Sequence, residues 1–174
     1  ASGLAERGYD VTSVVAYRTV LRRPTASELR AALAADAVAF ASGIAAQAAA
    51  LFTLLTPGDH LVSSSALYGG TVNQLKHLLR KMNVELTWVD PDDPGAWKAA
   101  VRGNTKAFYG ETIGNPGGNV LDIEAVATIA HAHDLPLIVD NTFATPFLCR
   151  PIEWGADIVL HSATKFIGGH GTSI

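Results

Sequence analysis

Several features that mark common protein classes are scarce in this sequence, and cysteine is the scarcest. Cys149 is the single cysteine among 174 residues, so the chain cannot form an internal disulfide or a cysteine-based metal site. His131 and His133 are spaced so that they do not share one face of an expected helix, which argues against a zinc pair. We therefore expect no metal, and a reducing compartment with the cytoplasm as the default.

Long apolar runs and concentrated positive charge are also missing. The longest apolar stretch, 45–55, is interrupted by Gln47 and Thr53 and is too short to span a bilayer. The first residues lack the basic-then-apolar order of a signal peptide. The 13 Lys and Arg residues are scattered and the net charge is -3, and no Gly-x-Gly-x-x-Gly follows a strand. The sequence predicts a soluble protein that binds neither membranes nor nucleic acids and lacks the usual nucleotide-binding motif.

Apolar segments suited to a layered core are abundant, since 48% of the residues are hydrophobic and 17% are charged. From Val38 onward, short strand-like segments alternate with segments of helical period, which is typical of parallel strands joined by helices. The expected strands are 38–41, 60–63, 85–89, 106–109, 137–139 and 158–160. The expected helices are 43 to about 56, 71–82, 95–101 and 123–133. We predict an α/β domain over residues 38–174, with a mostly parallel sheet covered by helices on both faces, preceded by an N-terminal segment, 1–37.

Parallel sheets bind ligands at the carboxyl ends of their strands, and Lys165 follows the last expected strand. A buried lysine is costly unless it is paired or used covalently, and a desolvated amine can attack an aldehyde. If the chain stays extended, Ser162 and Thr164 point to one side and could hold a phosphate. Taken alone, however, a surface lysine at a strand exit is the more frequent arrangement.

Two further strand ends supply matching groups. Asp140 ends an apolar strand and could face the protonated ring nitrogen of a pyridoxal cofactor, although a turn or helix-capping Asp explains it equally well. Ser42-Gly43-Ile44 begins the Ala-rich helix, where backbone N–H groups and the helix dipole favour a phosphate. A plain serine N-cap is the alternative there.

Two loop residues complete the candidate site. Tyr68 precedes Gly69 and Gly70, so it could stack on a planar ring while the backbone approaches closely; a half-buried loop tyrosine is the alternative. Asn115 offers an amide for the ring hydroxyl, or serves as a turn residue before Pro116.

Five motifs in this order carry a resemblance to a known family: Ser42-Gly43-Ile44-Ala45-Ala46, Leu67-Tyr68-Gly69-Gly70-Thr71, Glu111-Thr112-Ile113-Gly114-Asn115-Pro116, Val139-Asp140-Asn141-Thr142 and Ser162-Ala163-Thr164-Lys165. From about Val38 to Ile174 the chain resembles the pyridoxal-phosphate enzymes of cysteine and methionine metabolism. The resemblance implies the large domain of a fold-type I, aspartate-aminotransferase-like enzyme that acts on an amino acid and forms a homotetramer of dimers.

The resemblance also implies a role for each site residue. Lys165 forms the Schiff base with pyridoxal phosphate, Asp140 faces its ring nitrogen, and Tyr68 stacks on the ring and relays protons. The remaining cofactor contacts are the phosphate-binding Gly43, Ile44, Ser162 and Thr164, together with Asn115 and Thr142.

Within the family, the motifs around Glu111, Phe143 and Gly168 are most similar to those of O-acetylhomoserine sulfhydrylases. This implies a transferase of methionine biosynthesis, in which Lys165 removes the Cα proton, acetate leaves and sulfide adds to give homocysteine. A cystathionine γ-synthase or γ-lyase would share every residue named above. An inactive, truncated cofactor-binding remnant is the alternative from another class.

The N-terminal and C-terminal parts depart from the family pattern. Tyr17-Arg18 and Arg23-Pro24-Thr25 do not have the spacing of the Tyr-x-Arg and Asn-Pro-Thr that reach a neighbouring subunit's phosphate site, so 1–37 is an inter-subunit arm only by analogy. The stretch 33–38 is shorter than usual. Because the chain ends soon after Lys165, we expect it to lack the C-terminal domain and the arginine for the substrate carboxylate.

Overall fold

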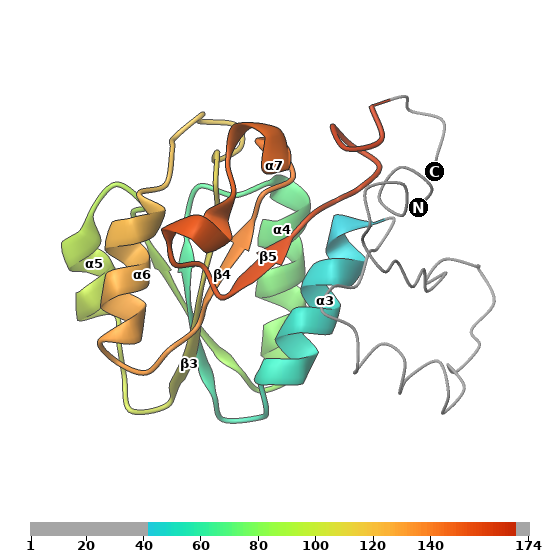
Figure 1. Ribbon diagram of the computed structural model, residues 1–174. Helices are drawn as coiled ribbons and strands as arrows, with labels where there is room; N and C mark the ends of the chain where they lie inside the picture. The colour runs from blue at the N-terminus through green and yellow to red at the C-terminus, as the bar shows by residue number, and fades with distance from the viewer. Residues whose placement is uncertain (1–41, 170–174) are drawn as a thin grey trace, which may run out of the picture.

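The computed structural model of the protein describes residues 42–169. The strand expected at 38–41 and the N-terminal segment 1–37 lie outside the described residues, as does the end of the expected domain. Within them, five parallel strands form one sheet in the order β2-β1-β3-β4-β5. The α/β class predicted from the sequence is therefore confirmed (Figure 1).

The strands lie close to their predicted positions. They are β1 His60–Ser64, β2 Glu85–Val89, β3 Thr105–Glu111, β4 Leu137–Asp140 and β5 Ile158–Leu160. Every residue of β1 and β4 is buried, as expected for strands of a parallel sheet that is covered on both faces. Differences are confined to one or two residues at the ends of β1, β3 and β4.

Helices cover both faces of the sheet, with α5 and α6 on one side and α3 and α4 on the other (Figure 1). They are α3 Gly43–Leu54, α4 Gly69–Gln74 with a π-helical continuation Leu75–Leu79, α5 Pro94–Ala99, α6 Ile123–His131, α7 Thr145–Leu148 and a 3-10 turn Pro151–Trp154. The predicted buried face of α6, made by Ile123, Val126, Ala127 and Ala130, is confirmed. None of the described helices is long and apolar enough to cross a membrane.

Neighbouring residues of the strands pack into two different cores because side chains alternate across a sheet. Val62, Phe108 and Val139 join the core under α5 and α6, which includes Trp97. Leu61, Tyr109 and Ile138 join the core under α3 and α4, which includes Leu51 and Leu75. This alternation explains how one sheet of continuous apolar strands supports two helical layers.

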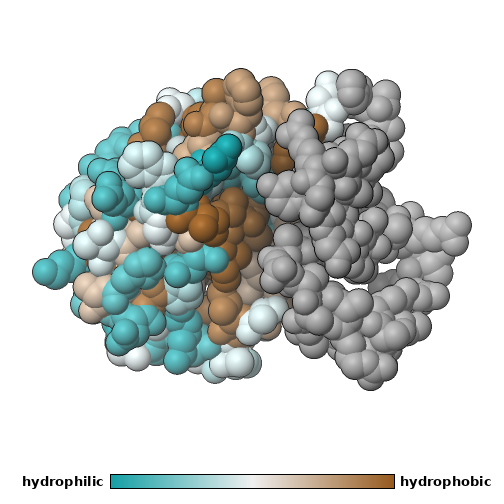
Figure 2. All heavy atoms as spheres, in the orientation of Figure 1, coloured by the Kyte–Doolittle hydropathy of each residue, from teal (hydrophilic) through white to brown (hydrophobic). Residues whose placement is uncertain are grey.

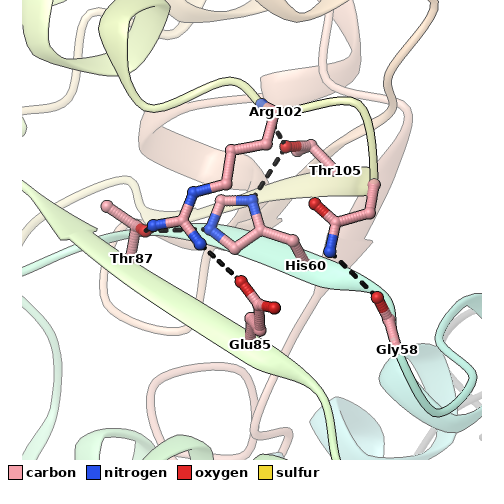
Figure 3. A network of polar contacts seen from close by, with 7 residues as sticks. Gly58, His60, Glu85, Thr87, Arg102 and Thr105 are labelled. Carbon is pink, nitrogen blue, oxygen red and sulfur yellow. Dashed lines mark hydrogen bonds and ion pairs between the residues drawn. The ribbon is translucent and has the colours of Figure 1, made fainter.

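A buried histidine holds three strands together at the amino edge of the sheet (Figure 3). The ring nitrogens of His60 on β1 lie 2.8 Å from the hydroxyls of Thr105 on β3 and Thr87 on β2. Arg102 donates to both hydroxyls. Burial lowers the pKa of His60, and the charge of Arg102 lowers it further, so the neutral imidazole is the form that joins these strands.

Candidate functional site

The polar ends of β3 and β4 lie side by side at the carboxyl edge of the sheet. Glu111 and Asp140, the last residues of these strands, are partners in the parallel register. Both are buried, with 9% and 7% of their surface exposed. The carboxyl edge of the sheet, where the sequence predicts ligand binding, therefore contains two acidic side chains in adjacent strands.

Asp140 is held by a hydrogen bond to each carboxylate oxygen. Its Oδ1 accepts from the backbone N–H of Thr142 at 2.9 Å, and its Oδ2 accepts from Gln47 Nε2 at 2.9 Å. The first bond is the turn role that the sequence allowed, and the second comes from α3 across the sheet edge. Asp140 thus closes a turn with Thr142, and its buried carboxylate is held in one orientation by Gln47.

Gln47 is a site residue that the sequence did not single out. It lies in α3, is 2% exposed, and its Nε2 also donates to Thr71 Oγ1 of α4 at 2.9 Å. Its Oε1 and the hydroxyl of buried Tyr109 have no hydrogen-bond partner among the described residues. The signal that could have found Gln47 is a lone amide in an otherwise apolar, Ala-rich helix.

Glu111 is a second residue without a predicted role. Its Oε1 accepts from the backbone N–H of Tyr68 at 2.9 Å, which ties the loop after β1 to the end of β3. Burial raises the pKa of Glu111 to about 7; the bond from Tyr68 opposes this rise and the charge of Asp140 adds to it. Its signal in the sequence is an acid at the end of a buried strand.

The two predicted phosphate-binding segments lie against each other. A Cβ at Gly43 would come within 3.1 Å of Ser162 Cβ, and the hydroxyls of Ser162 and Thr164 are 3.2 Å apart. The first helical N–H groups, those of Gly43 and Ile44, have no acceptor within the helix. Ser42 makes no side-chain capping bond, so the plain serine N-cap is absent.

The condition that the chain stays extended at 162–164 is not met. β5 ends at Leu160, and the chain then turns, with the N–H of Lys165 donating to Ser162 O at 3.0 Å and that of Gly168 to Ala163 O at 2.9 Å. The turn, rather than strand alternation, brings the hydroxyls of Ser162 and Thr164 to one side.

The turn also corrects the expectation of a buried Lys165. Its side chain is exposed, because the segment has already left the covered part of the sheet. The argument from a desolvated amine therefore does not hold for this arrangement, although the lysine follows directly on the hydroxyl pair at Ser162 and Thr164.

The remaining predicted residues differ in how closely they join the site. Thr142 Oγ1 accepts from the backbone N–H of Ser162 at 2.7 Å, linking the ends of β4 and β5. The ring of Tyr68 is half exposed and lies where a Cβ on Gly70 would collide with it. Asn115 is exposed in the loop after β3, and among the described residues its side chain has no hydrogen bond to the others.

The site lies at the end of the molecule where apolar side chains are also exposed. Figure 2 shows apolar surface at the end of the molecule where α7 lies. Phe143 and Phe166 pack edge to face there, with ring centroids 5.1 Å apart, and Phe147 is 92% exposed.

Among the described residues, no group of His, Cys, Asp and Glu side chains could hold a metal.

Comparison with known proteins places these features in a family context. Residues 16–174 match the family described as Cys/Met metabolism PLP-dependent enzyme. An O-acetyl-L-homoserine sulfhydrylase of Corynebacterium glutamicum is 48% identical over 160 residues, which are 88% of this chain and 37% of that protein. The chain therefore spans just over a third of the length of this relative.

Solved structures agree in fold. Cystathionine γ-lyase from Lactobacillus plantarum, complexed with L-serine, matches 78% of this chain and 35% of its own, with a TM-score of 0.75 and 43% identity. A Campylobacter jejuni chain described as an O-acetylhomoserine (thiol)-lyase, whose structure contains N'-pyridoxyl-lysine-5'-monophosphate, matches 76% of this chain and 33% of its own, with a TM-score of 0.74 and 39% identity.

Proposed function

This chain belongs to the pyridoxal-phosphate-dependent enzymes of cysteine and methionine metabolism, and we propose that it catalyses γ-replacement on O-acetylhomoserine with sulfide, giving homocysteine and acetate. The cofactor site is supported by the connected contacts of Asp140, Thr142, Ser162 and Gly43. The choice of O-acetylhomoserine and sulfide is carried by the 48% identity to the Corynebacterium glutamicum sulfhydrylase. We assign the cofactor-binding domain to residues 38–174.

The residues present fit pyridoxal phosphate, the cofactor of this family. A Cβ on Gly43 would lie 3.1 Å from Ser162 Cβ, so any side chain at this position would press on the hydroxyl pair. We assign the phosphate to Gly43, Ile44, Ser162 and Thr164, whose N–H and O–H groups are donors. The buried carboxylate of Asp140 suits a positively charged ring nitrogen.

Each remaining site residue has a proposed task. The bound cofactor supplies an electron sink for negative charge that develops at the substrate Cα. Lys165 Nζ would hold the cofactor and could act as the base for the substrate Cα proton. Tyr68 covers the ring face and relays protons, while Asn115 and Thr142 complete the cofactor contacts. The exposed position of Lys165 on a turn leaves its amine free to move between these tasks.

A γ-lyase or a cystathionine γ-synthase is the second candidate. The observation that favours a lyase is the fold and 43% identity shared with the Lactobacillus plantarum cystathionine γ-lyase, and the same site residues would serve it. We also propose that the protein acts as a homotetramer in the cytoplasm. A cofactor-binding remnant without turnover is the alternative from another class.

The first test is visible absorption of the purified protein. The wild type is expected to be yellow, the Lys165→Ala variant to lose this absorption, and Lys76→Ala, which removes an exposed lysine of the π-helical turn, to keep it. A colourless wild type, or an unchanged Lys165→Ala spectrum, would contradict the assignment of Lys165.

The second test separates the reactions. Homocysteine is expected from O-acetylhomoserine plus sulfide, with less cystathionine formed when cysteine replaces sulfide. Cystathionine without homocysteine would reverse the ranking, and bound cofactor without any turnover would identify a binding remnant.

A further inference from the structure

We propose that Gln47 is a positioning residue that orients the Asp140 carboxylate toward the cofactor ring, an inference that rests on the proposed function. Gln47 lies in the first turns of α3, and its Nε2 is 2.9 Å from Asp140 Oδ2. Both side chains are almost completely buried. The amide therefore reaches the acid in a place where water does not compete for the hydrogen bond.

The direction of the amide follows from its partners. A carboxylate accepts hydrogen bonds and cannot donate them, so an ionised Asp140 requires the NH2 side of Gln47. The second N–H of the same nitrogen donates to Thr71 Oγ1 at 2.9 Å, which fixes the amide between α3 and α4. Because Thr142 holds the other carboxylate oxygen, the carboxylate is restrained at both oxygens and cannot rotate freely.

A purely structural role explains Gln47 less well. Burying an amide is unfavourable unless its polar atoms are paired, and among the described residues neither Gln47 Oε1 nor Gln74 Oε1 has a hydrogen-bond partner. Gln74 of α4 provides an internal comparison, since its Nε2 donates to Ile44 O at 2.9 Å and thus also links α4 to α3. Gln74 forms the same kind of link without contacting Asp140, so helix linkage alone does not need Gln47.

The test compares Gln47→Leu with Gln74→Leu as the matched control. Apoprotein is titrated with pyridoxal phosphate while visible absorbance is followed, and the urea unfolding of each apoprotein is measured separately. Loss of a hydrogen bond to a charged group predicts about a tenfold increase in the cofactor Kd for Gln47→Leu. Gln74→Leu is expected to lower stability and to raise the Kd less than Gln47→Leu does, because its amide bonds the backbone carbonyl of Ile44 and not Asp140.

A double-variant cycle decides whether Gln47 acts through Asp140. In an Asp140→Asn background, Gln47→Leu is expected to cause no further loss of affinity. A wild-type Kd in Gln47→Leu, or an equal loss in both backgrounds, overturns the proposal. If Gln47→Leu does not fold, Gln47→Glu keeps the size of the side chain and removes the donor.

The Gln47→Glu variant is expected to bind the cofactor weakly at neutral pH and to recover as the pH falls, because a protonated carboxyl can again donate to Asp140. Affinity that equals the wild type across this pH range overturns the proposal. A wild type that binds no cofactor would refute the proposed function instead, so the two failures are distinguishable.

Discussion

Glu111 keeps a carboxyl group inside the protein, next to a second acid at the end of the neighbouring strand. Its pKa is raised to about 7, mainly by burial, so its folded form binds a proton more tightly than the unfolded chain does. A group of this kind stabilises the folded state below its unfolded pKa, and this contribution is lost as the pH rises through the folded value.

We therefore predict that Glu111→Gln flattens part of the pH dependence of stability. Each pKa unit corresponds to about 1.4 kcal/mol, so the rise from 4.5 to about 7 corresponds to roughly 3 kcal/mol by pH 8. The free energy of unfolding, measured in urea from pH 5 to 8, should fall less in Glu111→Gln than in the wild type.

Two other titratable groups bear on the design of this experiment, one as a control and one as an opposing contribution to the pH dependence. Glu124→Gln removes an exposed acid of α6 and should keep the wild-type slope. His60 has a lowered pKa, so its contribution to stability is complete above its unfolded pKa and is lost as the pH falls below it, a direction opposite to that of Glu111. The comparison is therefore made between variant and wild type at each pH. Parallel curves for Glu111→Gln and the wild type would show that Glu111 is not the group responsible.

Individual site residues could be singled out from the sequence where an acid or a glycine follows or ends an expected strand. Asp140 and Gly43 were singled out in this way. Asp140 accepts a bond from Thr142, and Gly43 lies against Ser162; their cofactor roles stay predictions. Gln47 was not found, because its partner is far away in the sequence and no local pattern connects the two. The prediction that Lys165 is buried was wrong, because it depended on how far β5 extends, and β5 ends at Leu160.

At the scale of elements, the loop from Tyr68 into α4 illustrates how two adjacent glycines differ. A Cβ on Gly70 would collide with the Tyr68 ring, whereas a Cβ on Gly69 would meet nothing within 4 Å. Because the ring is half exposed, it can move aside rather than break the fold.

We predict that Gly70→Ala weakens cofactor binding severalfold with little loss of stability, since alanine is favoured over glycine in a helix by about 0.5–1 kcal/mol. Gly69→Ala is expected to leave the cofactor Kd unchanged. Absorbance titration gives the Kd, and near-UV circular dichroism of the apoprotein reports the displaced tyrosine. Equal affinities for the two variants would mean that the ring position of Tyr68 does not matter for binding.

Elements with a strong period were predicted better than short or irregular ones. α6 shows its buried face in the sequence and is capped by Asp122, which accepts from Ala125 N. α7 has four residues, too few to produce a period, and was not predicted. The turn at 162–168 was also missed, because its hydrogen bonds depend on backbone geometry rather than on side-chain pattern.

At the scale of the whole molecule, the sheet separates a layer that reaches the site from one that does not. α3 and α4 contribute Gln47, Gly43 and Thr71 to the site, whereas α5 and α6 pack on the opposite face. The alternation of strand-like and helical segments predicted both layers, but which layer belongs to the site depends on the strand order.

This asymmetry predicts different outcomes for two fully buried residues. Trp97→Ala, in the core under α5 and α6, should lower stability by about 3–5 kcal/mol without changing the cofactor Kd. Leu51→Ala, on the buried face of α3, should lower stability by about 2–5 kcal/mol and also weaken cofactor binding, because α3 shifts. Urea unfolding and absorbance titration check both; a Kd change confined to Trp97→Ala would refute the division.

The central position of β3 has a consequence for folding fidelity. β3 pairs with both β1 and β4, and a shift of one residue along it would exchange Phe108 and Tyr109 between the two cores. The same shift would turn Glu111 away from the backbone of Tyr68 and leave a buried carboxyl without its partner. The acid at the end of β3 thus penalises misaligned sheets and helps the chain select one strand alignment as it folds.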